Sequence, residues 1–252
     1  MDFLETILLE KQREVKQLPH QPLQPLRETA TFCSRVRRHP ESVHVIGEIK
    51  RASPSKGSIN LNVDVVAQAK AYEQAGVSAI SVLTDEVFFK GSIETLQEVA
   101  SVVSIPVLCK DFIIDEKQLV RARNAGATMV LLIVAALAEE RLKTLFHKAT
   151  ELGLEVLLEV HDQAELGVAE SLAAPLIGVN NRNLKTFKVS IETSVALAAH
   201  QTTDAVYISE SGFETGDHVA QIAPFYQGVL VGETLMRAQH PQDKVRELRV
   251  TR

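Results

Sequence analysis

The sequence predicts a (β/α)₈ barrel preceded by an N-terminal helical extension. From residue 43 onward, eight short apolar runs alternate with longer amphipathic stretches. Their starts lie roughly 20 to 35 residues apart, which accommodates a strand, a crossover helix and the return to a parallel strand. A doubly wound sheet is the alternative, but no G-x-G-x-x-G turn follows any run. We therefore expect one α/β domain over residues 1–252, with residues 1–42 as the extension.

The predicted strands are short and apolar throughout, as strands buried on both faces are. They cover residues 43–49, 79–83, 107–108, 129–133, 156–158, 176–179, 205–208 and 229–231. The spacing of apolar residues predicts helices over residues 3–18, 63–75, 93–102, 116–125, 139–152, 164–172, 191–199, 219–225 and 244–250. Because the first helix carries mixed charge, we expect it to pack against the barrel rather than lie on a membrane.

Composition disfavours several classes of protein. With 27 Lys and Arg against 32 Asp and Glu, the net charge is −5, which disfavours a nucleic-acid-binding surface. The chain starts without a basic, then apolar, leader, and no stretch is long and apolar enough to span a bilayer. The two cysteines, Cys33 and Cys109, form no metal-binding motif, so we expect reduced, packed thiols. We expect a cytoplasmic monomer that binds neither membrane nor nucleic acid.

The first predicted strand ends in an acid and a base on the same face. Glu48 and Lys50 are two residues apart, and strand side chains alternate between faces. Pro54 and Gly57 then shape the loop that follows. A single pair of this kind is most often a surface ion pair. Here, however, polar strand ends recur along the chain.

Polar side chains follow most of the other predicted strands. They are Lys110 and Phe112 after the third strand, Glu159 after the fifth, Asn180 and Arg182 after the sixth, Glu210, Ser211 and Gly212 after the seventh, and Gly232 and Glu233 after the eighth. In a (β/α)₈ barrel these strand ends meet at one mouth, where active sites lie. Because buried isolated charges are costly, the cations Lys50, Lys110 and Arg182 and the carboxylates Glu48, Glu159 and Glu210 must pair with each other or serve a ligand.

The loops after the last two strands have the composition of a phosphate site. Ser211-Gly212 and Gly232-Glu233 stand where barrels of this kind bind phosphate through free backbone N–H groups. Ser53 in the first loop could add a hydroxyl donor. We therefore expect a small phosphorylated substrate, with ordinary turn chemistry as the alternative for each glycine.

Two of the charged residues are candidates for acid–base chemistry. A lysine among cations has its pKa lowered, and a glutamate in an apolar pocket has its pKa raised. On this basis Lys110 and Glu159 form a plausible couple, and a structural ion pair across the barrel is the alternative reading.

Several neighbours of these charges are apolar or out of phase with them. Phe89, Phe112 and Leu132 could form an apolar wall for a planar ring, although core packing explains each equally well. His161 is expected to be a capping or surface residue. Asp111, one residue out of phase with Lys110, should face the helices or solvent.

Taken together, these stretches resemble indole-3-glycerol phosphate synthases. The matching segments, in the family's order, are EIKRASPSKG at 48–57, LTD at 83–85, FFKGS at 88–92, KDFIID at 110–115, VLLI at 130–133, LEVH at 158–161, GVNNRNL at 178–184, SESG at 209–212 and LVGE at 230–233. The EIKRASPSKG and KDFIID motifs are specific to the family, whereas LVGE is shared by many phosphate-binding barrels. The family also carries an amphipathic N-terminal extension.

The resemblance implies ring closure, decarboxylation and dehydration of 1-(2-carboxyphenylamino)-1-deoxyribulose 5-phosphate, with no metal or organic cofactor. It implies Lys110 as general acid, Glu159 as general base, and Lys50 as the partner of the aromatic carboxylate, helped by Glu48. The remaining implied roles are orientation by Asn180, Arg182 and Glu210, and phosphate binding by Ser53, Ser211, Gly212, Gly232 and Glu233. Because some relatives carry Ser or Thr at position 233, only the backbone N–H of Glu233 is expected to meet the phosphate.

Two other functions remain possible from the sequence. One is a related phosphosugar barrel such as phosphoribosylanthranilate isomerase, although an isomerase has no need of two strand-end lysines beside an aromatic-acid pocket. The other is a catalytically idle barrel that binds a metabolite or a protein, which the presence of Glu48, Lys110 and Glu159 together disfavours.

Overall fold

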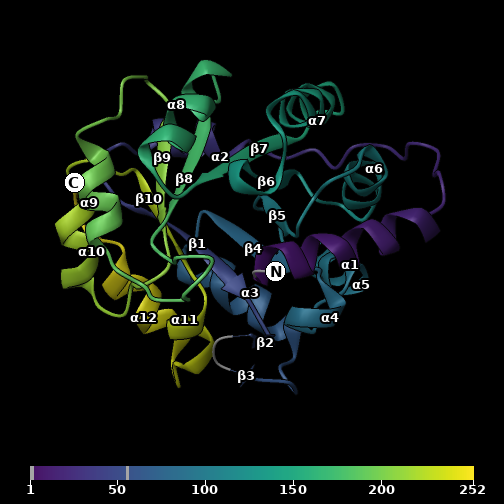
Figure 1. The fold of residues 1–252 in the computed structure, drawn as a ribbon. Coiled ribbons are helices and arrows are strands. Elements are labelled where there is room, and N and C mark those ends of the chain that lie inside the picture. The colour runs from purple at the N-terminus through teal and green to yellow at the C-terminus, as the bar shows by residue number, and fades with distance from the viewer. Residues whose placement is uncertain (1–2, 55–56) are drawn as a thin grey trace.

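The computed structural model describes residues 3–54 and 57–252 and shows a closed barrel of parallel strands surrounded by helices (Figure 1). Around the barrel the strands follow the order β1-β10-β9-β8-β7-β6-β5-β4, so that β1 pairs with both β10 and β4. The strands are β1 His44–Ile49, β4 Ala79–Leu83, β5 Val107–Lys110, β6 Met129–Ile133, β7 Glu155–Val160, β8 Leu176–Asn180, β9 Val206–Glu210 and β10 Gly228–Val231. The predicted (β/α)₈ fold is confirmed.

Each predicted helix is present with small shifts at its ends. These helices are α1 Phe3–Gln17, α3 Val65–Ala75, α5 Ile93–Val102, α6 Glu116–Asn124, α7 Glu139–Glu151, α8 Gln163–Ser171, α9 Glu192–Ala198, α10 Gly216–Ile222 and α12 Pro241–Leu248. Local capping sets several ends: Asp115 and Gln118 form a capping box at the start of α6, and Gly76 ends α3 at φ 88°.

Several short elements were not predicted. They are α2 Phe32–Arg38, α4 Glu86–Phe89, α11 Glu233–Arg237, a 3₁₀ turn Val134–Ala136, and the hairpin β2 Ala52–Ser53 with β3 Gly57–Ser58. Ser55 and Lys56, in the loop predicted after the first strand, lie outside the described residues.

The core has two layers that follow strand alternation. On β6, Val130 and Leu132 pack between the strands and the outer helices. Met129, Leu131 and Ile133 instead fill the barrel interior. The polar strand ends therefore lie above a packed, apolar interior, which keeps the charged groups at one end of the barrel.

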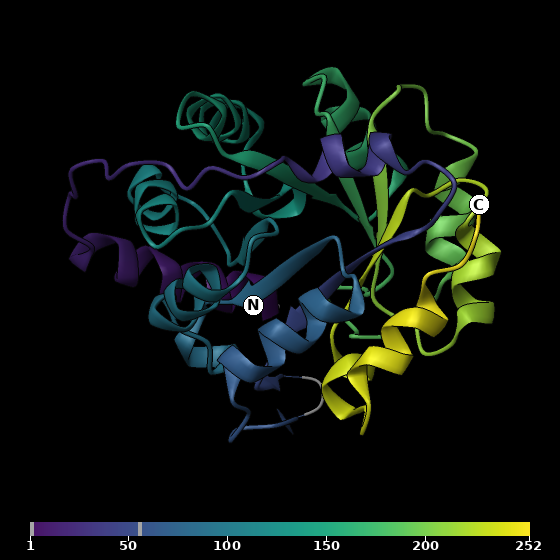
Figure 2. The same cartoon turned by 180° about the vertical axis from the view of Figure 1, so that it is seen from behind.

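The N-terminal extension places a helix at each end of the barrel. Figure 1 shows α1 across the end that carries the polar strand ends, and the reverse view in Figure 2 shows α2 at the other end. The backbone N–H groups of Phe32 and Cys33 in α2 donate to the Glu155 carboxylate at 2.7 and 3.0 Å, where β7 begins. The first helix packs against the barrel, as expected.

Two further expectations concern thiols and membranes. Both cysteines are free and buried, which agrees with packed thiols. Within the described ranges, no helix has the length and apolar character needed to cross a bilayer.

Candidate active site

A cavity of about 850 Å³ lies at the C-terminal ends of the strands. It brings together most of the side chains that the sequence analysis placed at one mouth. These are Glu48, Lys50, Phe89, Lys110, Phe112, Glu159, Asn180, Arg182, Glu210, Ser211, Gly212, Gly232 and Glu233. Residues as far apart in the chain as Glu48 and Glu233 thus border one space.

Two predicted site residues are placed elsewhere. Leu132 packs against the outer helices, and its neighbours Leu131 and Ile133 line the cavity instead. The prediction for Leu132 was wrong because β6 is apolar on both faces, so its sequence does not reveal which face points inward. Ser53 pairs with Gly57 in the β2–β3 hairpin and is not among the described residues that line the cavity.

Lys110 lies between two buried carboxylates. Its Nζ is 2.8 Å from Glu210 Oε2 and 3.2 Å from Glu159 Oε2. Burial lowers the pKa of Lys110, but Glu210 and Glu159 outweigh it and hold that pKa above the ordinary value. We expected a lysine among cations with a lowered pKa, and this was wrong because its neighbours are carboxylates from β7 and β9.

The two carboxylates differ in charge state. Burial raises the pKa of Glu159, but the Lys110 ammonium and then His161 outweigh it, so that pKa lies below its ordinary value, the reverse of our expectation. Burial raises the pKa of Glu210 to about 7; Lys110 opposes this shift and the Glu159 carboxylate adds to it. Of these two groups, Glu159 is ionised at neutral pH and Glu210 can exchange a proton there.

Glu48 and Lys50 form a second ion pair on the same rim. Lys50 Nζ lies 2.5 Å from Glu48 Oε1. Burial raises the pKa of Glu48, but the charges of Lys50 and Lys110 lower it by more, so that the net shift is downward. A Cβ on Gly232 would collide with Glu48 Oε1 and lie 3.1 Å from Lys50 Nζ. Glycine at 232 therefore leaves the space that this pair occupies.

Gly178 on β8 likewise leaves space for the carboxylate of Glu210. A Cβ there would collide with Glu210 Oε1 and lie 3.1 Å from Leu157 Cδ1. Neither Gly178 nor Gly232 has a positive φ, so space rather than backbone conformation requires glycine at both positions.

His161, expected to be a capping or surface residue, is partly buried beside Glu159, so the surface alternative was wrong. Its Nε2 lies 3.3 Å from Glu159 Oε1 and its Nδ1 lies 3.0 Å from Glu165 Oε2. Burial lowers the pKa of His161, but these two carboxylates raise it to about 10, so the ring is cationic at neutral pH. The two-residue spacing from Glu159 was the signal that could have identified this contact.

The loop after β9 has a constrained backbone. Ser211 and Gly212 both adopt positive φ, at 70° and 96°. The Asn181 side chain donates to the Ser211 carbonyl oxygen and to Ser209 Oγ, each at 3.0 Å. Left-handed conformation at a non-glycine residue costs free energy, so these contacts hold the loop in one shape.

The loop after β10 leads directly into α11. Gly232 is the N-cap residue of α11. Because glycine lacks a side chain, it makes no capping hydrogen bond to the first N–H groups of the helix. Glu233 Oε1 accepts from Arg237 Nε at 3.0 Å. Arg237 and Lys244 also line the cavity, and sequence reasoning missed both because they lie in helices beyond the last strand.

The apolar side of the cavity has two parts. Phe89 and Phe112, whose ring centroids are 6.1 Å apart, form what we call the aromatic wall. Phe3, Leu4 and Ile7 of α1 border the same space, and sequence reasoning did not place them there because α1 is remote from the strands in sequence. The cavity can therefore take a ligand with a flat apolar part, a carboxylate and a second anionic group.

Comparison with known proteins gives a family match over nearly the whole chain. The family model for indole-3-glycerol phosphate synthase matches residues 4–248. The indole-3-glycerol phosphate synthase of Listeria welshimeri is 58% identical over 252 residues, covering 100% of both chains. That of Streptococcus pneumoniae Hungary19A-6 is 55% identical over 249 residues, covering 99% of this chain and 98% of the relative.

Solved structures of low sequence identity share the fold. The 3-hexulose-6-phosphate synthase of Salmonella typhimurium aligns with a TM-score of 0.66 at 15% identity, over 82% of this chain and 96% of that one. The tryptophan synthase alpha chain of Legionella pneumophila aligns with a TM-score of 0.62 at 13% identity, over 86% and 94%. At these identities the likeness shows the barrel alone.

Proposed function

The chain belongs to the indole-3-glycerol phosphate synthase family, and from this premise we propose how its cavity performs the reaction. The activity is that of a carboxy-lyase of tryptophan biosynthesis. The substrate, 1-(2-carboxyphenylamino)-1-deoxyribulose 5-phosphate, becomes indole-3-glycerol phosphate with release of carbon dioxide and water. Its aromatic carboxylate, ribulose carbonyl and phosphate call for three different kinds of subsite.

The phosphate binds between the loops after β9 and β10. Ser211, Gly212 and Gly232 offer backbone or hydroxyl donors there, and the Glu233 N–H begins α11. The Glu233 carboxylate would repel the phosphate, but Arg237 already pairs with it at 3.0 Å. This pairing supports a role for the backbone of Glu233 alone.

The aromatic ring lies against the aromatic wall and its carboxylate meets Lys50 and Arg182. Both cations line the cavity, and Lys50 Nζ lies 2.5 Å from Glu48 Oε1. When the substrate carboxylate takes over Lys50, Glu48 loses its main partner and becomes able to accept a proton. Asn180 and Glu210 orient the hydroxyl groups of the sugar.

Ring closure joins the ring carbon that bears the carboxylate to the ribulose carbonyl carbon. The Lys110 ammonium donates a proton to the carbonyl oxygen as this bond forms, and a raised pKa keeps Lys110 charged for that step. Carbon dioxide then leaves, and the electron pair of the broken C–C bond restores the aromatic ring. The former carbonyl carbon of the ribulose now carries a hydroxyl group.

Dehydration completes the indole. Lys110, reprotonated, donates to the departing hydroxyl, and Glu159 accepts the proton of the neighbouring carbon so that the double bond forms. Overall one proton is taken from solvent, because a carboxylate leaves as neutral carbon dioxide. Once Lys110 turns to the substrate, Glu159 loses its nearest cation and becomes a stronger base.

The observation that carries this assignment is the position of Lys110 Nζ within 3.2 Å of both Glu159 and Glu210 at the cavity. To test it, purified protein without added metal is given the substrate, and indole-3-glycerol phosphate is followed by indole fluorescence. Lys110→Ala and Glu159→Ala should each lose on the order of 10² to 10⁴ in kcat. Full turnover by the double variant would refute the assigned roles.

We also propose that residues 1–252 act as one catalytic domain, as a monomer in the cytoplasm. The contribution of Phe3, Leu4 and Ile7 to the cavity supports a single unit. The exposed large apolar side chains are scattered over several elements rather than gathered in one stripe. Elution as a dimer in size-exclusion chromatography, together with loss of activity on dilution, would contradict the monomer.

A further inference from the structure

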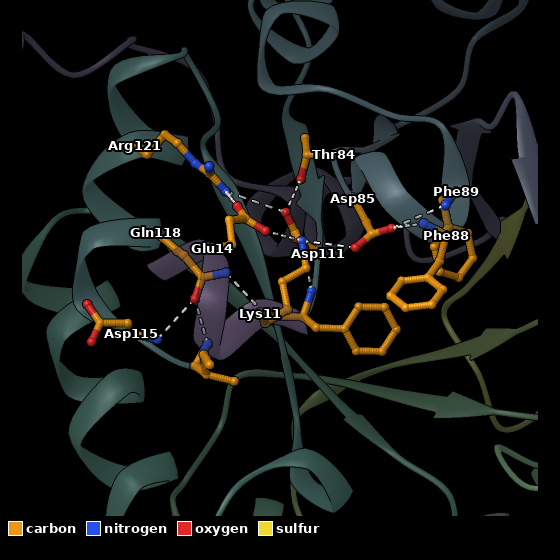
Figure 3. Close-up of polar contacts among 12 residues, drawn as sticks. Lys11, Glu14, Thr84, Asp85, Phe88, Phe89, Asp111, Asp115, Gln118 and Arg121 are labelled. Carbon is orange, nitrogen blue, oxygen red and sulfur yellow. Dashed lines mark hydrogen bonds and ion pairs between the residues drawn. The ribbon is translucent and has the colours of Figure 1, made fainter. Parts of the chain in front are cut away.

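We propose that Lys11 of α1 is a positioning residue that holds the aromatic wall in place and so sets the affinity for the ring end of the substrate. Lys11 is 1% exposed although its helix lies outside the barrel. Its Nζ lies 2.7 Å from Asp111 Oδ1, 3.0 Å from Asp85 Oδ2 and 2.8 Å from Glu14 Oε2 (Figure 3). A lysine this deeply buried needs partners in fixed positions.

Asp111 links Lys11 to one half of the aromatic wall. Its Oδ1, which pairs with Lys11, also accepts from the Phe112 N–H at 2.8 Å. Its other oxygen, Oδ2, accepts from the Thr84 hydroxyl at 2.6 Å. The carboxylate thus holds the backbone of Phe112 and is itself held by Lys11 and Thr84.

Asp85 links Lys11 to the other half. Its Oδ1 accepts from the N–H groups of Phe88 and Phe89 at 2.6 and 3.2 Å and so caps the short helix α4, while Oδ2 faces Lys11 (Figure 3). A helix of four residues has little stability of its own, so its orientation depends on this cap. Both aromatic rings of the wall are therefore held through carboxylates that share one ammonium group.

Among the described residues, Lys11 is the only cation that pairs with Asp85. Asp85 and Asp111 are 1% and 3% exposed. Arg121 pairs with Glu14 at 2.7 Å and lies 3.8 Å from Asp111 Oδ2, and among the described residues it forms no ion pair with Asp85. Removal of Lys11 would leave two buried carboxylates facing each other, and repulsion would push α4 away from the end of β5.

The same helix also closes the outer side of the cavity. Phe3 packs edge-to-face against Phe88 and Phe187, with ring centroids 5.5 and 5.0 Å apart. Lys11 therefore fixes α1 relative to the strand ends as well as fixing the aromatic wall. Because Lys11 itself is not among the described residues that line the cavity, it acts through Asp85 and Asp111 rather than by touching the substrate.

The inference rests on the proposed function, and its test separates the two ends of the substrate. We would measure KM and kcat by indole fluorescence, and the inhibition constants of 2-aminobenzoate, as a probe of the ring end, and of inorganic phosphate. Lys11→Met should raise KM and the 2-aminobenzoate constant roughly tenfold, because a pre-formed wall is lost, and leave kcat and the phosphate constant within about threefold.

Matched variants distinguish positioning from general damage. Lys16→Met, the same substitution at an exposed position of α1, should behave as the wild type. Lys11→Arg keeps the charge and should restore KM to within about threefold of the wild type. If Lys11→Met does not fold, Asp85→Asn takes its place: it keeps the cap acceptor and removes the ion pair. It should raise KM and the 2-aminobenzoate inhibition constant at least about fivefold while the phosphate constant stays within about threefold, and no change in the first two would overturn the inference.

The inference is overturned if Lys11→Met changes neither KM nor the inhibition constant of 2-aminobenzoate. It is also overturned if Lys11→Met changes the inhibition constants of 2-aminobenzoate and phosphate equally. A wild-type protein that forms no product would instead refute the proposed function. An active wild type whose Lys11 variants bind 2-aminobenzoate normally would refute this inference alone.

Discussion

Glu210, 1% exposed, holds Lys110 Nζ at 2.8 Å and yet has a raised pKa of about 7. The cause is that Lys110 is shared with Glu159, which also faces His161. One ammonium group cannot fully compensate two buried carboxylates, so the carboxylate with fewer other cations nearby takes up the proton. This unequal sharing leads to the first prediction.

Glu210→Gln should change how stability depends on pH. In the wild type, a folded-state pKa of about 7 lies above the ordinary value of 4.5, so the folded state binds more protons between these two values. Glu210 therefore contributes stability at low pH that is lost as the pH rises through this window. We therefore expect the thermal stability of Glu210→Gln to rise relative to that of the wild type as the pH increases from about 5 to 8, and thermal unfolding over this range measures it. A constant difference across that range would contradict the raised pKa.

His161→Gln should shift the pH dependence of catalysis. The cationic imidazole, 3.3 Å from Glu159, helps to keep the pKa of that carboxylate low. Without it, Glu159 takes up a proton at higher pH, so the acidic limb of the kcat/KM profile should move upward by about one unit. His147→Gln, at an exposed position of α7, is the control and should leave the profile unchanged.

Gly232→Ala should reduce activity more than stability. The added methyl group would collide with Glu48 Oε1 and lie 3.1 Å from Lys50 Nζ, while the φ of −112° suits alanine. The flexible ends of these side chains can yield, at the expense of their pairing, so we expect kcat/KM to fall at least about tenfold and the unfolding free energy to change by under about 1 kcal/mol. Gly167→Ala, in α8 with open space around it, should keep full activity and slightly raise stability. Equal kinetics for the two variants would contradict the steric role of Gly232.

Leu131→Ala and Leu132→Ala should have different effects although they are neighbours on β6. Leu131 lines the cavity, so its truncation should raise KM for the substrate. Leu132 is fully buried among the outer helices, so its truncation should lower the unfolding free energy by about 2–5 kcal/mol and leave KM unchanged. Substrate saturation curves and urea unfolding of both variants test this, and a raised KM for Leu132→Ala would restore its place in the site.

The pairing of residues two apart was predictable at several strand ends. Glu48 with Lys50 and Lys110 with Phe112 border the cavity together, as strand alternation requires. The same rule, applied to Glu159 and His161, would have found their contact. It failed for Leu132 because every residue of β6 is apolar and buried, so the pattern carries no sign of which face points inward.

The order of strands and helices and the set of polar residues at the strand ends could be predicted from the amino-acid sequence, because both follow from local periods of the chain. The carboxylate neighbours of Lys110 and the contacts of Lys11 with Asp85 and Asp111 were visible only in the folded chain. Charge state and ion pairing depend on distances across the barrel and on burial. Both are set by how distant segments pack together, which no local pattern records.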